Sequence, residues 1–209
     1  MFNALKCNRM NCPGYMLPKT FFEQEQDYIC KICESIVPYA EIEKILENIG
    51  IYLSTMKKND IIACKEFINR RYESTLHPNH FYNIDVTIAL AQLIGQQTGG
   101  LAAVEKDLLI EKIELCKKLD KLLKTLVPAE NRIRGLILFE LHAAHADLSR
   151  RHTEMEILVP LLQESKKYLV DGYQLLKYEP KVLPEGKIAQ HAEQNLHEIN
   201  KLLKRFNVT

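Results

Sequence analysis

The sequence is 209 residues long, which suits one or two domains with a buried core. Its net charge of +1 is not the strong field of a protein that binds nucleic acid directly or lies on a membrane surface, so we expect neither partner. No apolar run is long enough to cross a bilayer, and the first residues, MFNALKCNRMNC, lack the features of a signal peptide. We therefore expect an intracellular protein, in the cytoplasm, the nucleus or both.

Four of the six cysteines are clustered near the N-terminus, as Cys7, Cys12, Cys30 and Cys33. In a reducing compartment such a cluster favours metal ligation over disulfides. Two close pairs on two turns can supply the four soft ligands that a tetrahedral zinc site requires. The sequence therefore predicts one structural zinc ion bound by these four cysteines. Four unrelated thiols or two disulfides are the alternatives.

The segment around these cysteines is short and contains turn-forming residues such as Pro13, Gly14 and Pro18. Residues 15–17 and 28–29 are apolar or aromatic and are expected to be short strands of a zinc-ribbon-like module. A segment this small has no room for a core of its own, so the metal would supply its stability. We place this four-cysteine module at residues 1–37.

From Pro38 onward the apolar residues recur with the period of an α-helix, which predicts an all-α domain at residues 38–209. Asn59-Asp60 supplies a cap, and Pro38 and Pro184 suit helix starts. Pro160 should kink the sixth helix or mark its start. The seven expected helices cover residues 38–58, 60–72, 78–94, 105–126, 130–151, 154–178 and 184–206.

Loops of a few residues predict that successive helices pack as antiparallel neighbours. The last four helices resemble two hairpins whose starts are about 50 residues apart, longer than the 34-residue tetratricopeptide unit. We therefore predict a tetratricopeptide-like array rather than strict repeats. The concave face of such an array is a groove suited to a protein or peptide partner.

Single residues elsewhere give weaker signals. His142 and His145 are three residues apart and could share a metal, but helix packing is the favoured interpretation. His77 and His80 flank a proline at a helix start, where capping and packing are expected.

Cys64 and Cys116 are interpreted as small core residues. The basic pairs at residues 70–71, 150–151 and 204–205 could line a groove for an acidic peptide end. We find no phosphate loop and no nucleophile elbow, and predict no catalytic residue.

Three segments resemble a known family. ALKCNRMNCPGYMLPK followed by YICKIC resembles the segment after the post-SET region in the arthropod-specific SmydA, or msta-like, branch of the SET and MYND domain (SMYD) family. LHPNHFYNIDVTIALAQLIG, residues 76–95, and PAENRIRGLILFELHAAHADLSRR resemble two segments of that family's C-terminal helical domain. Together the likeness extends roughly from residue 4 to residue 206.

The family's enzymes are S-adenosylmethionine-dependent protein-lysine methyltransferases, in which a MYND zinc finger splits the SET domain. This sequence has none of the SET, MYND or post-SET motifs, so no catalytic or cofactor-binding residue is carried over. The resemblance implies the same four cysteine ligands, although the branch usually has two intervening residues in both pairs and often a Trp where Tyr28 stands.

The resemblance implies a non-catalytic, zinc-stabilised helical interaction module that packs beside a SET domain in the full family protein and meets partners such as chaperone tails. We expect the separate chain to be a truncated gene model, an isoform or a degenerate paralogue. The alternative is a fragment of an active protein (histone)-lysine methyltransferase whose SET and MYND part lies upstream. S-adenosylmethionine is expected only in the full family protein.

Overall fold

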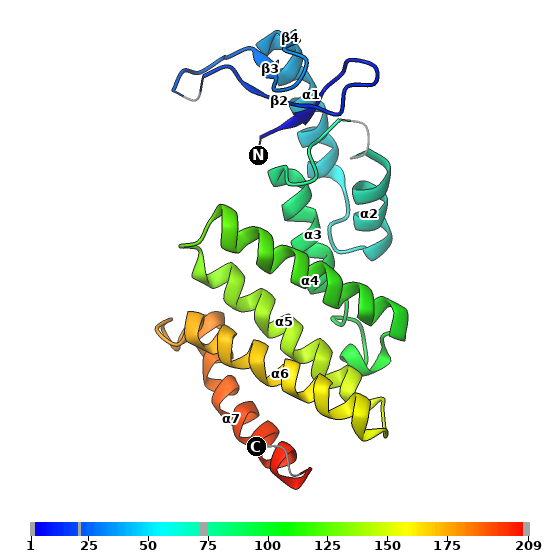
Figure 1. The fold of residues 1–209 in the computed structure, drawn as a ribbon, viewed down its shortest axis with the longest axis vertical. Coiled ribbons are helices and arrows are strands. Elements are labelled where there is room, and N and C mark those ends of the chain that lie inside the picture. The colour runs from blue at the N-terminus through cyan, green and yellow to red at the C-terminus, as the bar shows by residue number, and fades with distance from the viewer. Residues whose placement is uncertain (1–2, 21, 72–74, 207–209) are drawn as a thin grey trace. The chain divides into compact units, whose positions relative to one another are not determined.

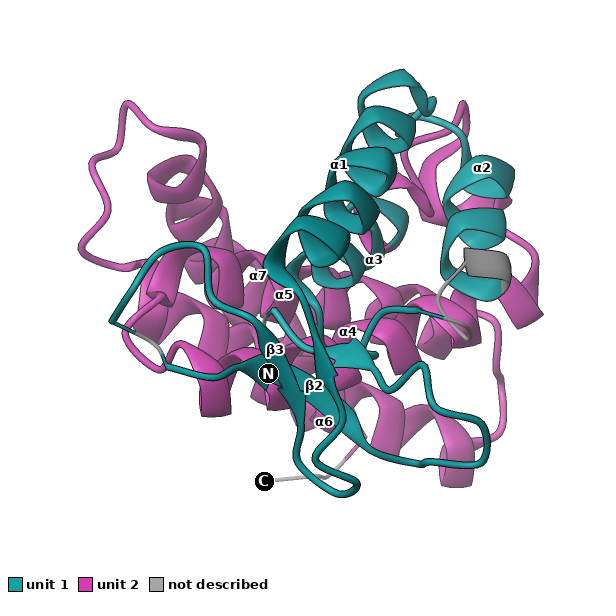
Figure 2. Ribbon diagram, turned by 90° about the horizontal axis from the view of Figure 1, so that it is seen from above, with its two compact units in different colours: residues 1–90 teal, residues 91–209 magenta. Residues whose placement is uncertain are grey.

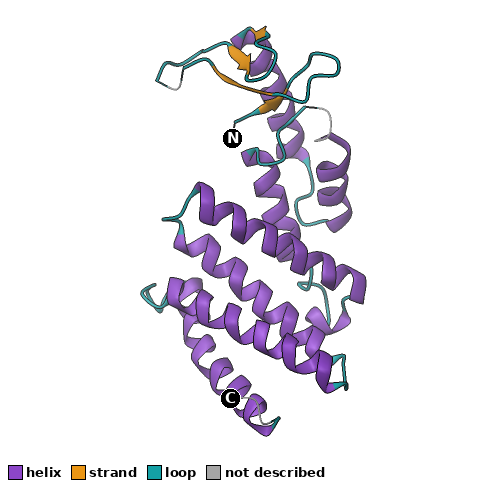
Figure 3. Ribbon diagram, in the orientation of Figure 1, coloured by secondary structure: helices purple, strands orange, loops and turns teal. Residues whose placement is uncertain are grey.

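The computed structural model describes residues 3–20, 22–71 and 75–206. The chain forms two compact units, residues 1–90 and residues 91–209 (Figure 2). The expected boundary at Pro38 is where strands give way to helices, whereas the compact units divide after Leu90. Within the described ranges the chain is mostly helical, with seven α-helices and a small sheet near the N-terminus, as the sequence predicted (Figure 3).

The sheet of the first unit has four short strands, paired antiparallel in sequence order. Met16 lies opposite Leu5 on one side and opposite Cys30 on the other, and these three side chains are buried. The two expected strands between the cysteine pairs are therefore confirmed. The strands are β1 (Leu5–Lys6), β2 (Tyr15–Pro18), β3 (Tyr28–Cys30) and β4 (Ile36–Val37).

Three helical segments follow the sheet. Pro38 directly precedes the first, and the Asp60 carboxylate caps the second by accepting the Ile62 N–H at 2.9 Å. The third begins after His80, whose ring Nδ1 accepts the Tyr82 N–H at 3.3 Å, so the expected capping role of this histidine is confirmed. These segments are α1 (Tyr39–Thr55), α2 (Ile61–Glu66) with a π-helical turn (Phe67–Arg71), and α3 (Phe81–Leu93), whose last residues belong to the second unit.

The second unit is built from four long helices after a short 3-10 helix (Gly100–Ala103). Each long helix packs against the next along the chain (Figure 1). Leu162 and Leu169 of the third of these form a core with Ile199 and Leu203 of the last. The four helices are α4 (Lys106–Leu126), α5 (Asn131–Arg150), α6 (Met155–Leu176) and α7 (Pro184–Arg205).

Helix α6 begins at Met155 and continues through Pro160, so Pro160 does not mark its start. A proline inside a helix removes only one backbone hydrogen bond, to the residue four positions before it, and the buried residues of α6 outweigh that loss. Among the described helices, none combines the length and the apolar character needed to cross a membrane. A tetratricopeptide-like arrangement stays a prediction.

Candidate metal centre

The four N-terminal cysteines converge on one point. Their sulfur atoms all lie within 4.8 Å of one another. The Cys7 sulfur lies 3.6 Å from the Cys33 sulfur, and the Cys12 sulfur lies 3.7 Å from the Cys30 sulfur. Each of these contacts connects a cysteine of the first pair in the sequence to one of the second pair. A disulfide would bring two sulfurs to about 2.05 Å, and all four cysteines are free thiols. The structure therefore shows a four-sulfur cluster that could hold a metal ion such as zinc.

The sheet and two tight turns bring the sulfurs together. Cys7 directly follows β1 and Cys30 is the last residue of β3, so antiparallel pairing through β2 sets both positions. Asn11 and Glu34 have positive φ angles of 64° and 58°, and they adjoin Cys12 and Cys33. A left-handed residue beside each of these cysteines turns the chain back toward the cluster.

Backbone amides point at three of the sulfurs. The N–H groups of Arg9, Gly14 and Ile32 donate to the sulfurs two residues earlier, at 3.4, 3.4 and 3.5 Å. The repeated spacing means that each turn folds around its own cysteine. Such donors stabilise negative charge on sulfur and orient the ligand.

Gly14 leaves the space that two of the sulfurs occupy. A Cβ atom at this position would lie 2.5 Å from the Cys30 sulfur and 3.2 Å from the Cys12 sulfur. Cβ atoms essentially never make a contact of 2.5 Å, so a side chain here would force the Cys30 sulfur or the Gly14 backbone to move. The glycine is therefore required by the cluster.

Ser35 provides a polar side chain beside the cluster, with its Oγ 3.2 Å from the Cys33 sulfur and 3.5 Å from the Cys7 sulfur. The hydrogen bond from Ser35 lowers the pKa of Cys33 to about 5. Burial opposes ionisation of Cys30, but the N–H groups of Cys33 and Ile32 outweigh it and lower the pKa of that thiol.

The pKa of Cys12 changes in the opposite direction. The Gly14 N–H lowers it, but burial and the three neighbouring sulfurs together raise the pKa of Cys12 to about 12. Without a cation, a fourth thiolate beside the other sulfurs is unfavourable because like charges repel. A bound divalent cation removes that penalty, which fits the donor set to a metal.

All four donors come from the chain itself, which is the full set for a tetrahedral site. Such a site is closed, because no coordination position is left for substrate. The sequence predicted that these four cysteines come together, but not the roles of Gly14 and Ser35. The signal for both was their position two residues after one of the clustered cysteines.

The remaining candidates have other partners. His142 Nδ1 lies 2.9 Å from the Ser165 hydroxyl, and His145 Nδ1 lies 2.8 Å from the Leu141 carbonyl oxygen. Both rings are buried, as the packing interpretation expected, and within the described ranges the four-cysteine cluster is the one group arranged to hold a metal.

Cys64 and Cys116 are fully buried, as predicted. Burial raises the pKa of Cys116 to about 12, so its thiol is unreactive. Of the three basic pairs, the side chains of residues 70–71 lie outside the described part of the chain.

No protein-family model matches this chain, and no curated protein matches its sequence significantly. The likeness to the SMYD family is therefore a hypothesis that depends on the three sequence segments.

Proposed function

We propose that the chain is a non-catalytic, zinc-stabilised helical module that binds protein partners. The observation that carries this proposal is the spacing of the four sulfurs. Zinc bound tetrahedrally at about 2.3 Å from each sulfur holds the sulfurs about 3.8 Å apart. Two of the sulfur pairs, at 3.6 and 3.7 Å, already have this spacing, and all four sulfurs lie within 4.8 Å of one another.

A structural role for the metal follows from the size of the sheet and from the donor set. The strands are two to four residues long, and strands this short are not stable in isolation. A structural zinc ion contributes on the order of 10 kcal/mol to the folding of such modules. Four protein ligands also leave no open position, which catalysis at the metal would need.

Contacts between two of the SMYD-like segments support the proposed derivation from a SMYD-type protein-lysine methyltransferase. The Lys6 N–H donates to the Thr75 carbonyl oxygen at 2.7 Å, and the His77 N–H donates to the Ala4 carbonyl oxygen at 3.0 Å. The ring of His77 also lies against Tyr15 of β2, with ring centroids 4.2 Å apart. The cysteine segment and the LHPNH segment therefore fold as one structure within the first unit.

The interaction role rests on the helical second unit. Stacked helix pairs present grooves in which an extended or helical segment can lie. The partners we propose are peptide segments of other proteins, including chaperone tails, in the cytoplasm or the nucleus. The proposal includes no membrane partner and no direct nucleic-acid partner. A net charge of +1 does not create the strong positive field that attracts either of these anionic partners.

The zinc site is tested by metal analysis of the purified chain by plasma mass spectrometry. We expect about one zinc per chain, as four thiolates per ion require. Cys30→Ser with Cys33→Ser should abolish it, whereas Cys64→Ala, outside the cluster, should retain it. Negligible metal in the unsubstituted chain, together with a fold that a chelator leaves unchanged, would overturn the zinc site.

The rival function is lysine methylation by a longer SMYD-type enzyme of which this sequence is a part. Sequencing of the transcript upstream of Met1 distinguishes the two, because an in-frame SET and MYND coding region there would make this chain a fragment. Incubation of the 209-residue chain with labelled S-adenosylmethionine and histones tests whether the chain is itself an enzyme. We expect transfer at the level of the protein-free control. Transfer above that level would show that the chain is itself an enzyme.

A further inference from the structure

Two adjoining cavities lie in the second unit, both lined by residues of α5 and α7. One has a volume of about 270 Å³, and its walls are mainly apolar side chains of α6 and α7. The other, of about 370 Å³, has more polar walls and extends to the loop before α4. His142, Ala146, Arg150 and Asn195 line both cavities, so the two adjoin at these residues. The apolar walls are Leu158, Leu162, Ile199, Leu202 and Phe206.

His142 provides a hydrogen-bond acceptor at the junction of the two cavities. The ring Nδ1 of His142 lies 3.3 Å from the Ser165 carbonyl oxygen, which can only accept a hydrogen bond, so this contact favours the tautomer with its proton on Nδ1. In that tautomer Nδ1 also donates to the Ser165 hydroxyl at 2.9 Å, the hydroxyl donates to the His142 carbonyl oxygen at 3.1 Å, and Nε2 carries the lone pair.

The free nitrogen of His142 faces open space. Nε2 has no hydrogen-bond partner among the described residues. It is also not fully buried, so a ligand can reach it. Burial lowers the pKa of His142 to about 4, so the ring is neutral at physiological pH. His142 is 6% exposed and lines both cavities, so Nε2 offers an acceptor to a ligand there.

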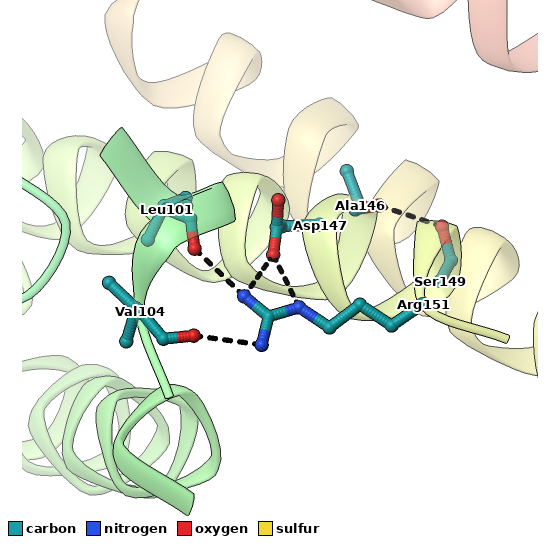
Figure 4. Close-up of polar contacts among 6 residues, drawn as sticks. All are labelled: Leu101, Val104, Ala146, Asp147, Ser149 and Arg151. Atoms are coloured by element: carbon teal, nitrogen blue, oxygen red, sulfur yellow. Dashed lines mark hydrogen bonds and ion pairs between the residues drawn. The ribbon is translucent and has the colours of Figure 1, made fainter. Parts of the chain in front are cut away.

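Arg150 places a positive charge on the cavity wall, so a ligand there should carry a negative charge. Its side chain is exposed, and it forms no ion pair with any residue of the described ranges. Asp147 also lines the polar cavity, but its Oδ2 accepts two hydrogen bonds from Arg151, at 2.9 and 2.7 Å (Figure 4). The unpaired cation on the cavity wall is therefore Arg150, and Asn195 beside it supplies a further polar group.

Arg151 also holds the far wall of the polar cavity in place. Its other hydrogen bonds go to the carbonyl oxygens of Leu101 and Val104, both at 2.8 Å (Figure 4). These bonds fix the 3-10 helix whose Leu101 lines the cavity. The polar cavity is thus built by long-range contacts and is not a gap beside a loose loop.

From this geometry we propose that the two cavities bind an acidic peptide segment by accepting a tyrosine or tryptophan side chain in the apolar cavity. The aromatic hydroxyl or indole N–H donates to His142 Nε2. An Asp or Glu near it in the peptide pairs with Arg150 while the peptide backbone lies in the open polar cavity. This inference rests on the proposed role of the chain as a protein-binding module, but not on the metal.

The alternatives for the anchor fit less well. Phenylalanine or leucine would fill the apolar cavity but leave the His142 lone pair without a donor, and an unpaired buried acceptor is costly. A basic neighbour in the peptide would face Arg150. Glu198 lines only the apolar cavity, so it disfavours an acidic residue at that end and places the acidic residue at the polar end.

Selection of a phage-displayed library of random 12-residue peptides on the full chain tests the proposal. We expect the enriched peptides to share a Tyr or Trp with an Asp or Glu within a few positions. An enriched set without the aromatic donor or without the acidic residue would overturn it.

An enriched peptide is then measured by fluorescence anisotropy. Exchange of its anchor Tyr for Phe should weaken binding about tenfold, the size of one hydrogen bond to a buried group. Arg150→Glu should weaken binding at least tenfold, because it places like charges together. Lys201→Glu, the same charge change at an exposed position of α7 outside both cavities, should have little effect.

The outcomes separate this inference from the broader proposal. Peptides whose binding is unchanged by Arg150→Glu and by Leu202→Asp would show that the chain binds peptides at another surface. The cavity assignment would then be wrong while the module's function stands. A library from which the unsubstituted chain enriches no peptide at all would overturn both.

Discussion

Gly14 is the residue at which the metal centre is most sensitive to a single added carbon. We expect Gly14→Ala to lower zinc affinity by 10- to 100-fold, the range seen for residues that orient metal ligands. The reason is steric, since the new Cβ would lie 2.5 Å from the Cys30 sulfur and 3.1 Å from the Ile32 Cβ. Competition with a chromophoric chelator measures the affinity.

Gly50→Ala is the matched control, because its Cβ would meet only the Tyr82 side chain. That chain should bind zinc as tightly as the unsubstituted one. Equal affinities for all three chains would show that Gly14 does not shape the site.

His142 predicts a pH dependence of stability. Burial, aided by Arg150 and His145, lowers the pKa of the folded ring to about 4 from about 6.5 when unfolded. Between these values the unfolded chain binds more protons, so stability is complete above pH 6.5 and falls as the pH drops toward 4. The ring contributes a loss on the order of 3 kcal/mol at pH 4.

Urea unfolding at pH 7 and pH 4.5 measures this effect. His142→Asn keeps an N–H donor for Ser165 but cannot titrate, so its loss of stability on acidification should be about 2 kcal/mol smaller. Burial also lowers the pKa of His145, but that ring is common to both chains. Identical pH dependences would mean that the ring is not the titrating group.

The clustering of the four cysteines could be predicted from sequence because their spacing carries the signal. The partners of His142 and Arg151 could not. Ser165 and Leu101 lie far from these residues in the chain, and only the packing of helices brings them together. Such contacts have no local pattern in the sequence.

At the scale of elements, Lys112 joins three segments of the second unit. Its ammonium group donates to the carbonyl oxygens of Ala91 and Ile94, at 2.6 and 2.7 Å, and pairs with Glu140 at 2.6 Å. Lys112 is buried, so its charge is stable only because all three partners are present.

Replacement of Lys112 should show the cost of leaving its three partners without a donor. We expect Lys112→Met to lower the free energy of unfolding by about 3 kcal/mol, since it leaves a carboxylate and two carbonyls without their donor. Adding Glu140→Gln should recover part of the loss. Lys117→Met, which breaks an exposed pair on the same helix, should cost less than about 1 kcal/mol.

Urea denaturation measures the free energy of unfolding of the unsubstituted chain, of Lys112→Met, of Lys112→Met with Glu140→Gln, and of Lys117→Met. Similar losses for Lys112→Met and Lys117→Met would show that the buried contacts contribute little.

Helix positions followed the sequence closely because apolar periodicity and caps are local. α4 and α5 lie at Lys106–Leu126 and Asn131–Arg150, within one residue of the expected bounds. The close approach of α5 and α6 was not predictable. A Cβ at Gly135 would lie 2.5 Å from Leu176, a contact that depends on which helices meet.

At the scale of the whole molecule, the expected division at Pro38 and the observed division after Leu90 differ for a physical reason. Two backbone hydrogen bonds, from the His77 N–H to the Ala4 carbonyl oxygen and from the Lys6 N–H to the Thr75 carbonyl oxygen, connect the edge strand β1 to the segment before α3. The cysteine module and the first helices therefore form one unit. A change in composition marks where strands end, but not where contacts end.

The metal should consequently control the stability of one unit and not the other. A chelator that removes zinc should increase amide hydrogen exchange in the β1–β4 sheet and in residues 75–80, because the cluster holds β1 and β3 together. Helices α4–α7 contain none of the four ligands and have a core of their own, so their exchange should change little. Re-addition of zinc should restore the protection of the sheet. Equal loss of protection across α4–α7 would show that the second unit does not fold independently of the metal.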